Sequence, residues 1–393
     1  MSREQIDRVL GEAVDSAALP GVSVAVAGPD DVYYRGCFGK ANVATGAPVT
    51  RDTVFRISSL TKSVVTLGLM QLVERGLVDP DQPVSSIIPA FDDIQVLEGF
   101  DGDTPRLRRP RTDVTVSHLA THTSGLTYDV WSEKMLRYQE ITGAVSSFTG
   151  KREGLFLPLT FDPGTDWAYG TGVDWTGEII ETVTGRRVDD YLRDEIFTPL
   201  RMHNTSFALD DRQRSRVAAV HHRDEQDKFV ATDFDWTPAD RVLSGHGLYS
   251  TVDDYTLFLQ MLLNDGAGDG HRLLQPETVR KMTENRIGDI DVPVMRSAMP
   301  QLSGDAEFFP GMRKKQSLGF QVTTEQWPGM RSAGSQFWAG LFNLFYWWDS
   351  TEKLAVTFAA QLLPFQDPRV MVVFERFERA VYQTSWGRDG DLW

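Results

Sequence analysis

The chain has 393 residues, of which 41% are hydrophobic and 24% are charged, with 10 Trp and 22 Phe. This composition excludes intrinsic disorder for the bulk of the chain, and the length allows two or three domains or one large α/β unit with an inserted lobe. Its 40 Lys and Arg against 55 Asp and Glu give a formal charge of -15, which disfavours nucleic acid and anionic membranes as partners. The single cysteine, Cys37, excludes an intrachain disulfide.

The first residues predict a helix and show no export signal. Their apolar residues have helical spacing: Ile6, Val9, Leu10, Ala13 and Val14. A signal peptide would instead contain a continuous apolar block. The longest nearly apolar run, residues 63–73, is shorter than the roughly 18 residues that a membrane-spanning helix needs. We therefore expect a cytoplasmic protein with no membrane partner.

A β-hairpin and a buried helix are predicted next. Residues 21–27 and 32–41 have the pattern of two strands around a Gly-Pro-Asp-Asp turn. From residue 59 to residue 75, apolar side chains surround most of a helix, which is typical of burial, and Gly76 ends it.

The middle of the chain predicts helices, and its last part predicts strands. Residues 79–235 are rich in Pro, Gly and helix-capping residues and contain helical patterns at 116–121, 173–184 and 188–197. The final portion contains apolar strands at 341–348 and 354–362 and a helical pattern at 368–382. The terminal parts thus supply strands with flanking helices, around an α-rich insertion.

The most informative local pattern is Ser59-Leu60-Thr61-Lys62, at the start of the buried helix. A spacing of three puts Ser59 and Lys62 on one helix face, where a neutral lysine can remove the serine proton. Burial in an apolar helix favours the neutral amine. The alternative is a capping serine followed by a lysine that reaches solvent, and we assign the second copy of the pattern, Ser350 to Lys353 in a polar turn, to that alternative.

Other catalytic patterns are missing or weak. No serine has the Gly-x-Ser-x-Gly context of an α/β-hydrolase. His118 and His122 have the spacing of two metal ligands on a helix, but no third ligand is in view, so no metal is expected. The basic run at residues 106–111 is interpreted as a solvated loop.

A second constellation contains Tyr169. It follows the Pro163-Gly164 turn and precedes the apolar helical pattern at 173–184. The positive end of that helix would favour a phenolate, and a phenolic oxygen beside a lysine can shuttle protons. An aromatic side chain packed over the insertion's core is the alternative.

Four phrases occur in one order along nearly the whole chain. They resemble the serine β-lactamase and penicillin-binding-protein superfamily, and within it the class C-like branch of family VIII carboxylesterases: 59–62, 122–126, 163–169 and 247–254. The resemblance implies an α+β fold, with an antiparallel sheet flanked by helices and built from both termini, plus an inserted helical domain. We place the α/β domain at residues 1–80 and 236–393 and the insertion at 81–235.

The resemblance also implies residue roles. Ser59 would be the acylated nucleophile, Lys62 would assist its deprotonation, and Tyr169 would pass a proton to the leaving alcohol and activate water. The backbone N–H groups of Ser59 and Leu341 would form the oxyanion hole. No cofactor is implied, because side chains alone would carry the protons.

Two departures from that pattern concern the substrate. Residues 169–171 are Tyr-Gly-Thr where a class C β-lactamase has Tyr-x-Asn, and Trp338-Ala339-Gly340 replaces its Lys-Thr-Gly. Trp338 offers an apolar wall and one indole donor instead of a cation, which favours neutral esters. Gly340 is expected to leave room where the substrate approaches the strand.

Substrate contacts are predicted for several aromatic residues. Phe342 falls on the side of Trp338 if the strand is regular. Three more aromatic residues lie in loop-like stretches and are candidates for the acyl or alcohol pocket: Tyr128, Trp131 and Trp236.

The leading functional prediction is a serine carboxylesterase acting on a small, neutral, short-acyl or aryl ester. An acyltransferase is the first alternative, since residues 337–349 also resemble fungal statin-type transesterases. A D-amino-acid peptidase or weak β-lactamase is a further alternative, and a non-catalytic binding module would have lost Ser59, Lys62 or Tyr169. The oligomeric state stays open.

Overall fold

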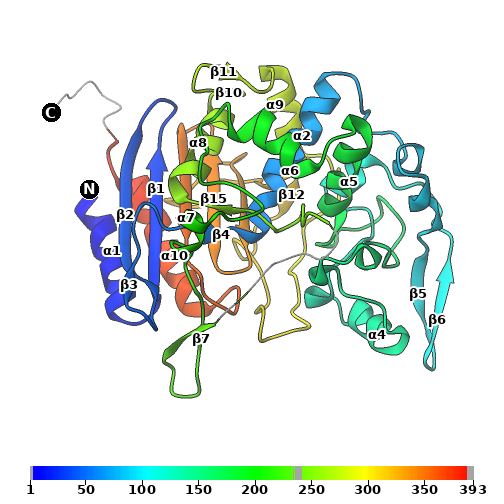
Figure 1. Ribbon diagram of the computed structural model, residues 1–393, viewed down its shortest axis with the longest axis horizontal. Coiled ribbons are helices and arrows are strands. Elements are labelled where there is room, and N and C mark those ends of the chain that lie inside the picture. The colour runs from blue at the N-terminus through cyan, green and yellow to red at the C-terminus, as the bar shows by residue number, and fades with distance from the viewer. Residues whose placement is uncertain (1–2, 233, 235–240, 387–393) are drawn as a thin grey trace.

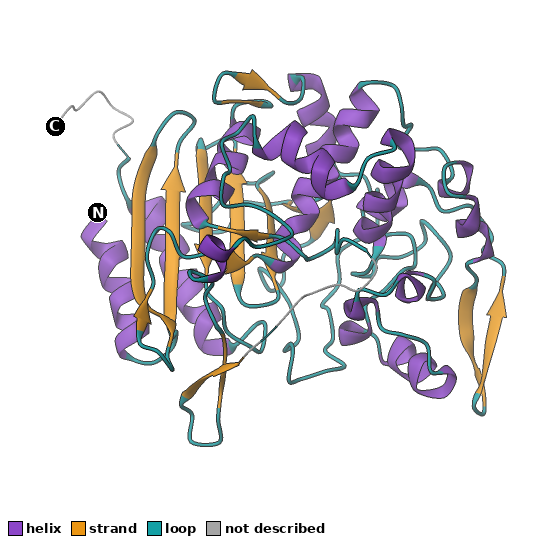
Figure 2. Ribbon diagram, in the orientation of Figure 1, coloured by secondary structure: helices purple, strands orange, loops and turns teal. Residues whose placement is uncertain are grey.

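The centre of the protein is an eight-stranded antiparallel sheet in a computed structural model that describes residues 3–232, 234 and 241–386 (Figures 1 and 2). Its spatial order is β12-β13-β14-β15-β16-β1-β2-β3. The strands are β1 (Gly21–Ala27), β2 (Val32–Asn42), β3 (Ala47–Pro48), β12 (Lys314–Gln316), β13 (Gln321–Thr323), β14 (Gln336–Gly340), β15 (Leu344–Asp349) and β16 (Leu354–Ala359). The predicted fold class, with an antiparallel sheet built from both ends of the chain, is confirmed.

Strand β1 joins the two ends of the chain. All seven of its residues are buried, and Ser23 pairs with Ala359 of β16 on one side and with Cys37 of β2 on the other. Small and β-branched side chains suit such a central strand, which has neighbours on both edges and side chains packed on both faces.

Adjacent residues of β15 show that helices cover both faces of the sheet. The hydroxyl of Tyr346 hydrogen-bonds to Ser63 of α2 (Thr61–Glu74), whereas the indole of Trp347 donates to Tyr382 of α10 (Pro368–Gln383). Since successive side chains of a strand point to opposite faces, α2 and α10 lie on opposite sides of the sheet. Helix α8 (Val252–Leu263) lies on the α2 side, because Tyr255 packs against Tyr346.

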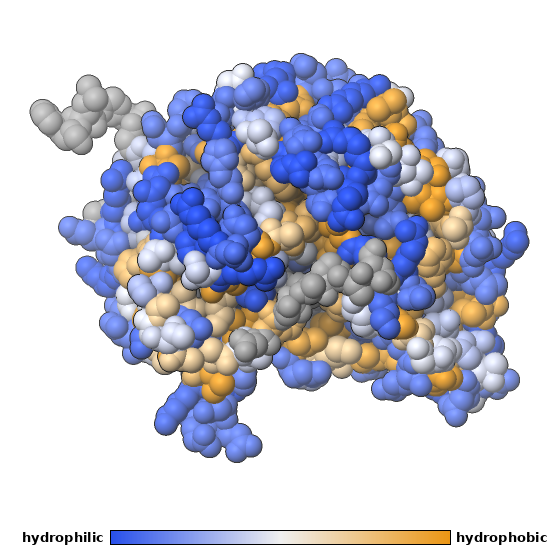
Figure 3. All heavy atoms as spheres, viewed as in Figure 1, coloured by the Kyte–Doolittle hydropathy of each residue, from blue (hydrophilic) through white to orange (hydrophobic). Residues whose placement is uncertain are grey.

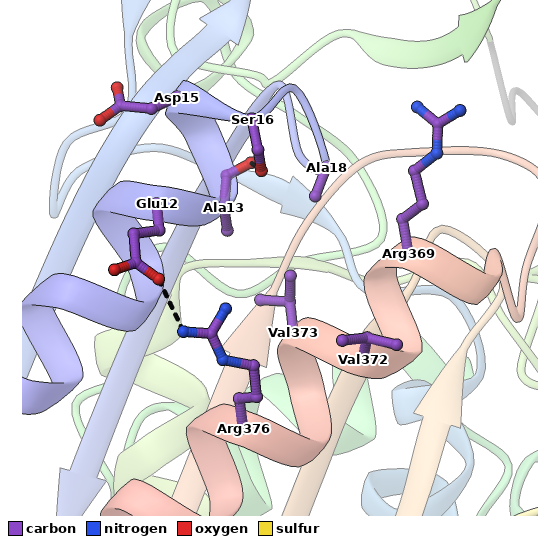
Figure 4. Close-up of a pocket in the computed structure, with 9 residues that line it drawn as sticks. All are labelled: Glu12, Ala13, Asp15, Ser16, Ala18, Arg369, Val372, Val373 and Arg376. Atoms are coloured by element: carbon purple, nitrogen blue, oxygen red, sulfur yellow. Dashed lines mark hydrogen bonds and ion pairs between the residues drawn. The ribbon is translucent and has the colours of Figure 1, made fainter.

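Helix α1 (Arg3–Asp15) packs beside α10. A groove of about 750 Å³ runs between the two helices, and the ion pair between Arg376 and Glu12, 2.6 Å long, crosses it (Figure 4). This groove is on the α10 side of the sheet, so the sheet separates it from α2.

The remaining helices and short hairpins lie mainly beside the α2 face (Figures 1 and 2). The helices are α3 (Val116–Ala120), α4 (Glu133–Thr142), α5 (Gly172–Thr184), α6 (Val188–Leu192) with a π-helical turn at Arg193–Phe197, α7 (Asp211–Arg214) and α9 (Pro276–Thr283). The short strands are β4 (Phe55–Arg56), β5 (Val96–Asp101), β6 (Thr104–Arg108), β7 (Val220–Arg223), β8 (Phe229–Thr232), β9 (Tyr249–Ser250), β10 (Ala267–Gly268) and β11 (His271–Arg272). Among the described residues, no helix has the length and apolar character needed to cross a membrane.

The predicted strand at 341–348 is wrong at its start. Strand β14 ends at Gly340 and β15 begins at Leu344, so residues 341–343 form the turn between them. Asn343 has a left-handed backbone (φ 59°), and its side-chain amide donates to the carbonyl oxygens of Leu362 and Pro364 at 2.9 and 2.8 Å. The turn residues are all buried, and Leu341 and Phe342 are apolar like strand residues, which hides the turn in the sequence.

Candidate active site

Ser59 lies in a 3-10 turn, Ser58–Leu60, that leads directly into α2. Ser58 has a left-handed backbone (φ 47°), and Thr61 holds the turn: its hydroxyl donates to the Ser58 carbonyl at 2.6 Å and accepts from the N–H of Leu248 at 3.1 Å. Ser59 remains half-buried while its neighbours are buried. The turn therefore presents one hydroxyl to solvent from an otherwise closed core.

Lys62 lies in the first turn of α2, three residues after Ser59, and is only 1% exposed. Its Nζ lies 3.3 Å from Ser59 Oγ, 3.1 Å from the hydroxyl of Tyr128 and 2.7 Å from the carbonyl oxygen of Gly245. Burial lowers the pKa of Lys62 from 10.5 to about 7, against a smaller opposing effect of the Asp174 carboxylate. A neutral amine is thus present near neutral pH, within reach of the serine proton.

Tyr169 completes the cluster. Its hydroxyl accepts a hydrogen bond from the indole of Trp338 at 3.1 Å and is hydrogen-bonded to Ser59, and its ring lies 4.8 Å from Lys62 Nζ. Burial raises the pKa of Tyr169, although the hydrogen bonds to Ser59 and Trp338 oppose the rise. The expected phenolate is therefore wrong. Asp174, in the first turn of α5, adds negative charge where the helix N-terminus would have supplied positive charge.

Strand β14 ends against the turn that carries Ser59. A Cβ on Gly340 would lie 2.7 Å from the carbonyl oxygen of Ile57 and 3.3 Å from Ser58 Cβ. The predicted reason for this glycine is corrected: the space beside it is filled by the turn that carries Ser59, not left for substrate. This close approach brings the backbone of Leu341 beside that turn, and its role as an oxyanion donor stays a prediction.

At its end nearest Ser59, strand β14 extends past the end of its neighbour β13, so its backbone edge there is not paired with β13. The pairing with β13 joins Gln321 to Phe337 and Val322 to Gln336, so it ends before Trp338. The side chain of Trp338 is on the face of its partner Tyr346, and alternation puts the side chain of Ala339 on the opposite face. Ala339 thus offers its backbone to the site.

The predicted pocket residues separate into three groups. Trp131 lines the site: its ring is 5.2 Å from that of Tyr169, and its indole donates to Ser303 Oγ at 3.1 Å. Phe342 is fully buried in the turn after β14, where it packs edge-on against Phe234, so strand alternation from Trp338 does not apply to it. Trp236 lies outside the described residues.

Tyr128 has a different position from the one predicted. It is 1% exposed, and its hydroxyl accepts from Lys62 and donates to Asp174 Oδ2 at 3.3 Å. It therefore contacts the candidate base instead of an open pocket.

Sequence reasoning missed the residues behind Lys62. Asp174 has a fully buried side chain and pairs with Arg241 at 2.7 Å. Burial would raise the pKa of Asp174, but the positive groups around it, Arg241 foremost, hold it below its ordinary value. The available signal was a carboxylate inside the apolar helical pattern at 173–184.

The two histidines considered as ligands have separate surroundings. His118 takes part in the N-terminal cap of α3 with Thr115, and His122 packs edge-on against Tyr169 at 4.8 Å. Burial and the nearby Lys62 lower the pKa of His122 well below its usual value. Within the described ranges, no three His, Cys, Asp or Glu side chains gather as a metal site would require.

The surface around the site is mixed. On the face shown in Figure 3, hydrophilic side chains cover most of the surface, and apolar ones come to the surface in the middle, between the sheet and the helical part. The aromatic side chains of Trp131 and Trp338 fit an approach for a largely apolar molecule.

The profile of the Beta-lactamase family matches residues 6–376. The chain belongs to the beta-lactamase family. Monacolin J acid methylbutanoyltransferase from Aspergillus terreus is 32% identical over 94% of this chain and 93% of its own. Lovastatin esterase from Penicillium rubens is 27% identical over 97% and 99%. The solved structure of simvastatin synthase from Aspergillus terreus matches with a TM-score of 0.84 and 28% identity, over 96% and 97% of the two chains.

These relatives show which enzymes of the beta-lactamase family the chain resembles. Their names describe an acyltransferase, a synthase and an esterase. The chain is thus an enzyme from a part of the family that contains both acyltransferases and esterases.

Proposed function

We propose that this protein is a serine acyltransferase that takes an acyl group from a neutral ester onto Ser59 and passes it to an alcohol. We choose an alcohol over water as the acceptor because the chain is 32% identical, over 94% of its length, to an enzyme named a methylbutanoyltransferase. The Ser59, Lys62 and Tyr169 cluster supports the acyl-serine chemistry. This proposal prefers the first alternative from the sequence over the leading carboxylesterase prediction.

The first half-reaction uses three side chains. Neutral Lys62 accepts the Ser59 proton as Oγ attacks the ester carbonyl, and the N–H groups of Ser59 and Leu341 stabilise the developing oxyanion. When the bond to the leaving alcohol breaks, Tyr169 donates its proton to that oxygen and regains one from Lys62. The product is the acyl-Ser59 ester, a free alcohol and an uncharged lysine.

The second half-reaction reverses these proton movements. Tyr169 passes its own proton to neutral Lys62 while it takes the proton of the acceptor alcohol, whose oxygen attacks the acyl-Ser59 carbonyl. Lys62 then returns a proton to Ser59 Oγ as the bond between that oxygen and the acyl carbon breaks. Water can take the same place, so hydrolysis is the competing outcome.

Trp338 supports a neutral acyl donor. Where the Lys-Thr-Gly pattern has a cation, this site has an indole whose N–H is already donated to Tyr169 at 3.1 Å. A substrate carboxylate would meet no cation on this strand, and an uncharged acyl group would find an apolar wall. This weighs against the β-lactamase and peptidase alternatives.

Hydrolysis is the second candidate, because lovastatin esterase matches over 97% of this chain. The experiment is to incubate the protein with p-nitrophenyl butyrate, measure its intact mass, and then add an alcohol such as benzyl alcohol and separate the products. We expect a butyryl adduct on the wild type, none on Ser59→Ala, and butyryl ester as a product. Ser350→Ala, in the second copy of the pattern, is the matched control and should keep the adduct.

The outcomes separate the alternatives. Full turnover by Ser59→Ala, or a wild type that never forms the adduct, overturns the acyl-serine assignment. An adduct that yields only butyric acid, across alcohols of different size at saturating concentration, replaces the transferase by an esterase.

A further inference from the structure

Lys62 has two neighbours that the proposed reaction does not use. Its Nζ lies 2.7 Å from the carbonyl oxygen of Gly245 and 3.1 Å from the hydroxyl of Tyr128, both closer than Ser59 Oγ at 3.3 Å. Gly245 and Tyr128 come from segments far apart in the chain, and both are buried. Their donor and acceptor properties determine how the amine is oriented.

Both neighbours face Lys62 as acceptors. A carbonyl oxygen has no proton to give, and the Tyr128 hydroxyl donates its proton to Asp174 Oδ2 at 3.3 Å. Burial, with the Asp174 charge next, raises the pKa of Tyr128 well above its usual value, so the phenol keeps that proton. The oxygen of Tyr128 is left with a lone pair for an N–H of Lys62.

Asp174 holds both acceptors in place. Its Oδ2 accepts a hydrogen bond from the Tyr128 hydroxyl, and its Oδ1 accepts hydrogen bonds from the backbone N–H of Gly245 at 3.2 Å and from the guanidinium of Arg241 at 2.7 Å. A Cβ on Gly245 would lie 2.3 Å from Asp174 Oδ2 and 2.8 Å from the Tyr128 hydroxyl. Only glycine therefore fits between the carboxylate and the phenol.

We propose that Tyr128, Asp174 and Gly245 are positioning residues that aim the lone pair of neutral Lys62 at the Ser59 hydroxyl. A neutral amine has two N–H groups and one lone pair, and the two acceptors take both N–H groups. The third direction, toward Ser59, is then left to the lone pair. This inference rests on the proposed function, since it assigns an orientation to the base of that reaction.

The same contacts serve the charged lysine. After it accepts the Ser59 proton, Lys62 has three N–H groups and three acceptors: Gly245 O, Tyr128 oxygen and Ser59 Oγ. The Asp174 charge favours this ammonium. The proton can therefore move without rearrangement of the surrounding dipoles, which is how preorganised sites lower barriers.

The test is the pH dependence of acylation in Tyr128→Phe. The ionisable groups that act on Lys62 come from the segment after α3, from α5 and the turn before it, and from the segment before β9: His122, Tyr128, Tyr169, Asp174 and His246. Arg241 pairs with Asp174. In the wild type, kcat/KM for p-nitrophenyl butyrate should rise with pH and level off above about 7. Between about pH 5 and 9, nitrophenol release gives this profile.

Tyr128→Phe removes one acceptor and should change two quantities. The plateau of kcat/KM should fall about 10- to 100-fold through kcat, with KM little changed, because the lone pair is no longer aimed. The rising limb should move to lower pH, because the ammonium loses a hydrogen-bond acceptor. Asp174→Asn should move the limb in the same direction, since the Asp174 charge raises the pKa of Lys62.

Tyr191→Phe is the matched control. Tyr191 is equally buried, and its hydroxyl donates to Gln71 further along α2, at 3.1 Å. This variant should keep the wild-type limb and plateau. If Tyr128→Phe also keeps both, or if it loses rate equally at every pH with no movement of the limb, the positioning role is wrong. A wild type without the acyl adduct would instead overturn the proposed function.

Discussion

The burial that suits Lys62 to its proposed role as a base lowers the stability of the folded protein. In the unfolded chain the lysine amine titrates near 10.5, and in the folded protein burial lowers the pKa to about 7. Between these values the unfolded chain binds one more proton, so the free energy of unfolding should rise with pH by up to about 1.4 kcal/mol per pH unit. Below pH 7 both states are charged and the full penalty applies, and above 10.5 the penalty vanishes.

Lys62→Met removes this titration. Urea unfolding of the wild type and the variant, across about pH 6 to 10, should show a stability difference that shifts toward the wild type as pH rises. Leu69→Met, another buried change in α2, should leave the pH dependence of the wild type unaltered. Parallel curves for the wild type and Lys62→Met would mean that the lysine is not desolvated as the structure shows.

Single residues also mark the limit of sequence reasoning. The three-residue spacing of Ser59 and Lys62 was enough to predict their contact, because a helix fixes the geometry locally. Only tertiary packing brings Gly245 into contact with Lys62 and places the Asp174 charge near it, and nothing near either residue in the sequence indicates this partner. The sequence predicts Tyr128 as a pocket residue because of its aromatic ring, whereas in the structure its hydroxyl contacts Lys62 and Asp174.

At the scale of elements, the contact between β14 and the turn that carries Ser59 fixes how close the backbone of Leu341 lies to that of Ser59, the two proposed oxyanion donors. Gly340→Ala would put a methyl group 2.7 Å from the Ile57 carbonyl oxygen and force the strand away from Ser59. We expect kcat for nitrophenol release to fall about 100-fold, comparable to loss of one oxyanion donor, while the protein still folds. Gly11→Ala in α1, where a Cβ meets nothing within 4 Å, is the control and should retain full activity. Wild-type kcat in Gly340→Ala would show that the strand position is not critical.

Strand β14 and its neighbours show why the bounds of some strands can be predicted from the sequence and those of others cannot. Strand β1 was predicted with the bounds that the structure has, Gly21–Ala27, since a Gly-Pro turn ends it clearly. The hairpin of β14 and β15 has a turn made of Leu341, Phe342 and Asn343, which are buried like strand residues. Periodicity cannot detect a turn whose polar groups are satisfied by a distant segment, here the carbonyl oxygens of Leu362 and Pro364.

For the whole molecule, the site exists only where the sheet and the helices meet. Trp338 lies on β14 of the sheet, and Ser59 lies in the turn that leads into α2, which packs on that sheet. Tyr128, Tyr169 and Asp174 come from the helical part of the chain, Asp174 from the first turn of α5. The charges nearest to Lys62 are balanced locally, because Asp174 pairs with Arg241. The formal charge of -15 therefore acts on a substrate from a distance, as a long-range field.

This difference between local and overall charge predicts how salt affects activity. An anionic ester, p-nitrophenyl hydrogen succinate, should be repelled at low ionic strength, and its kcat/KM should rise several-fold between about 10 mM and 300 mM NaCl as the field is screened. A neutral ester of similar length, p-nitrophenyl butyrate, feels no such field, and its kcat/KM should stay within about twofold. Stopped-flow measurement of nitrophenol release for both esters gives the comparison. If the anionic ester instead loses rate as salt is added, a local cationic surface governs its approach, and the preference for neutral acyl donors would have to be abandoned.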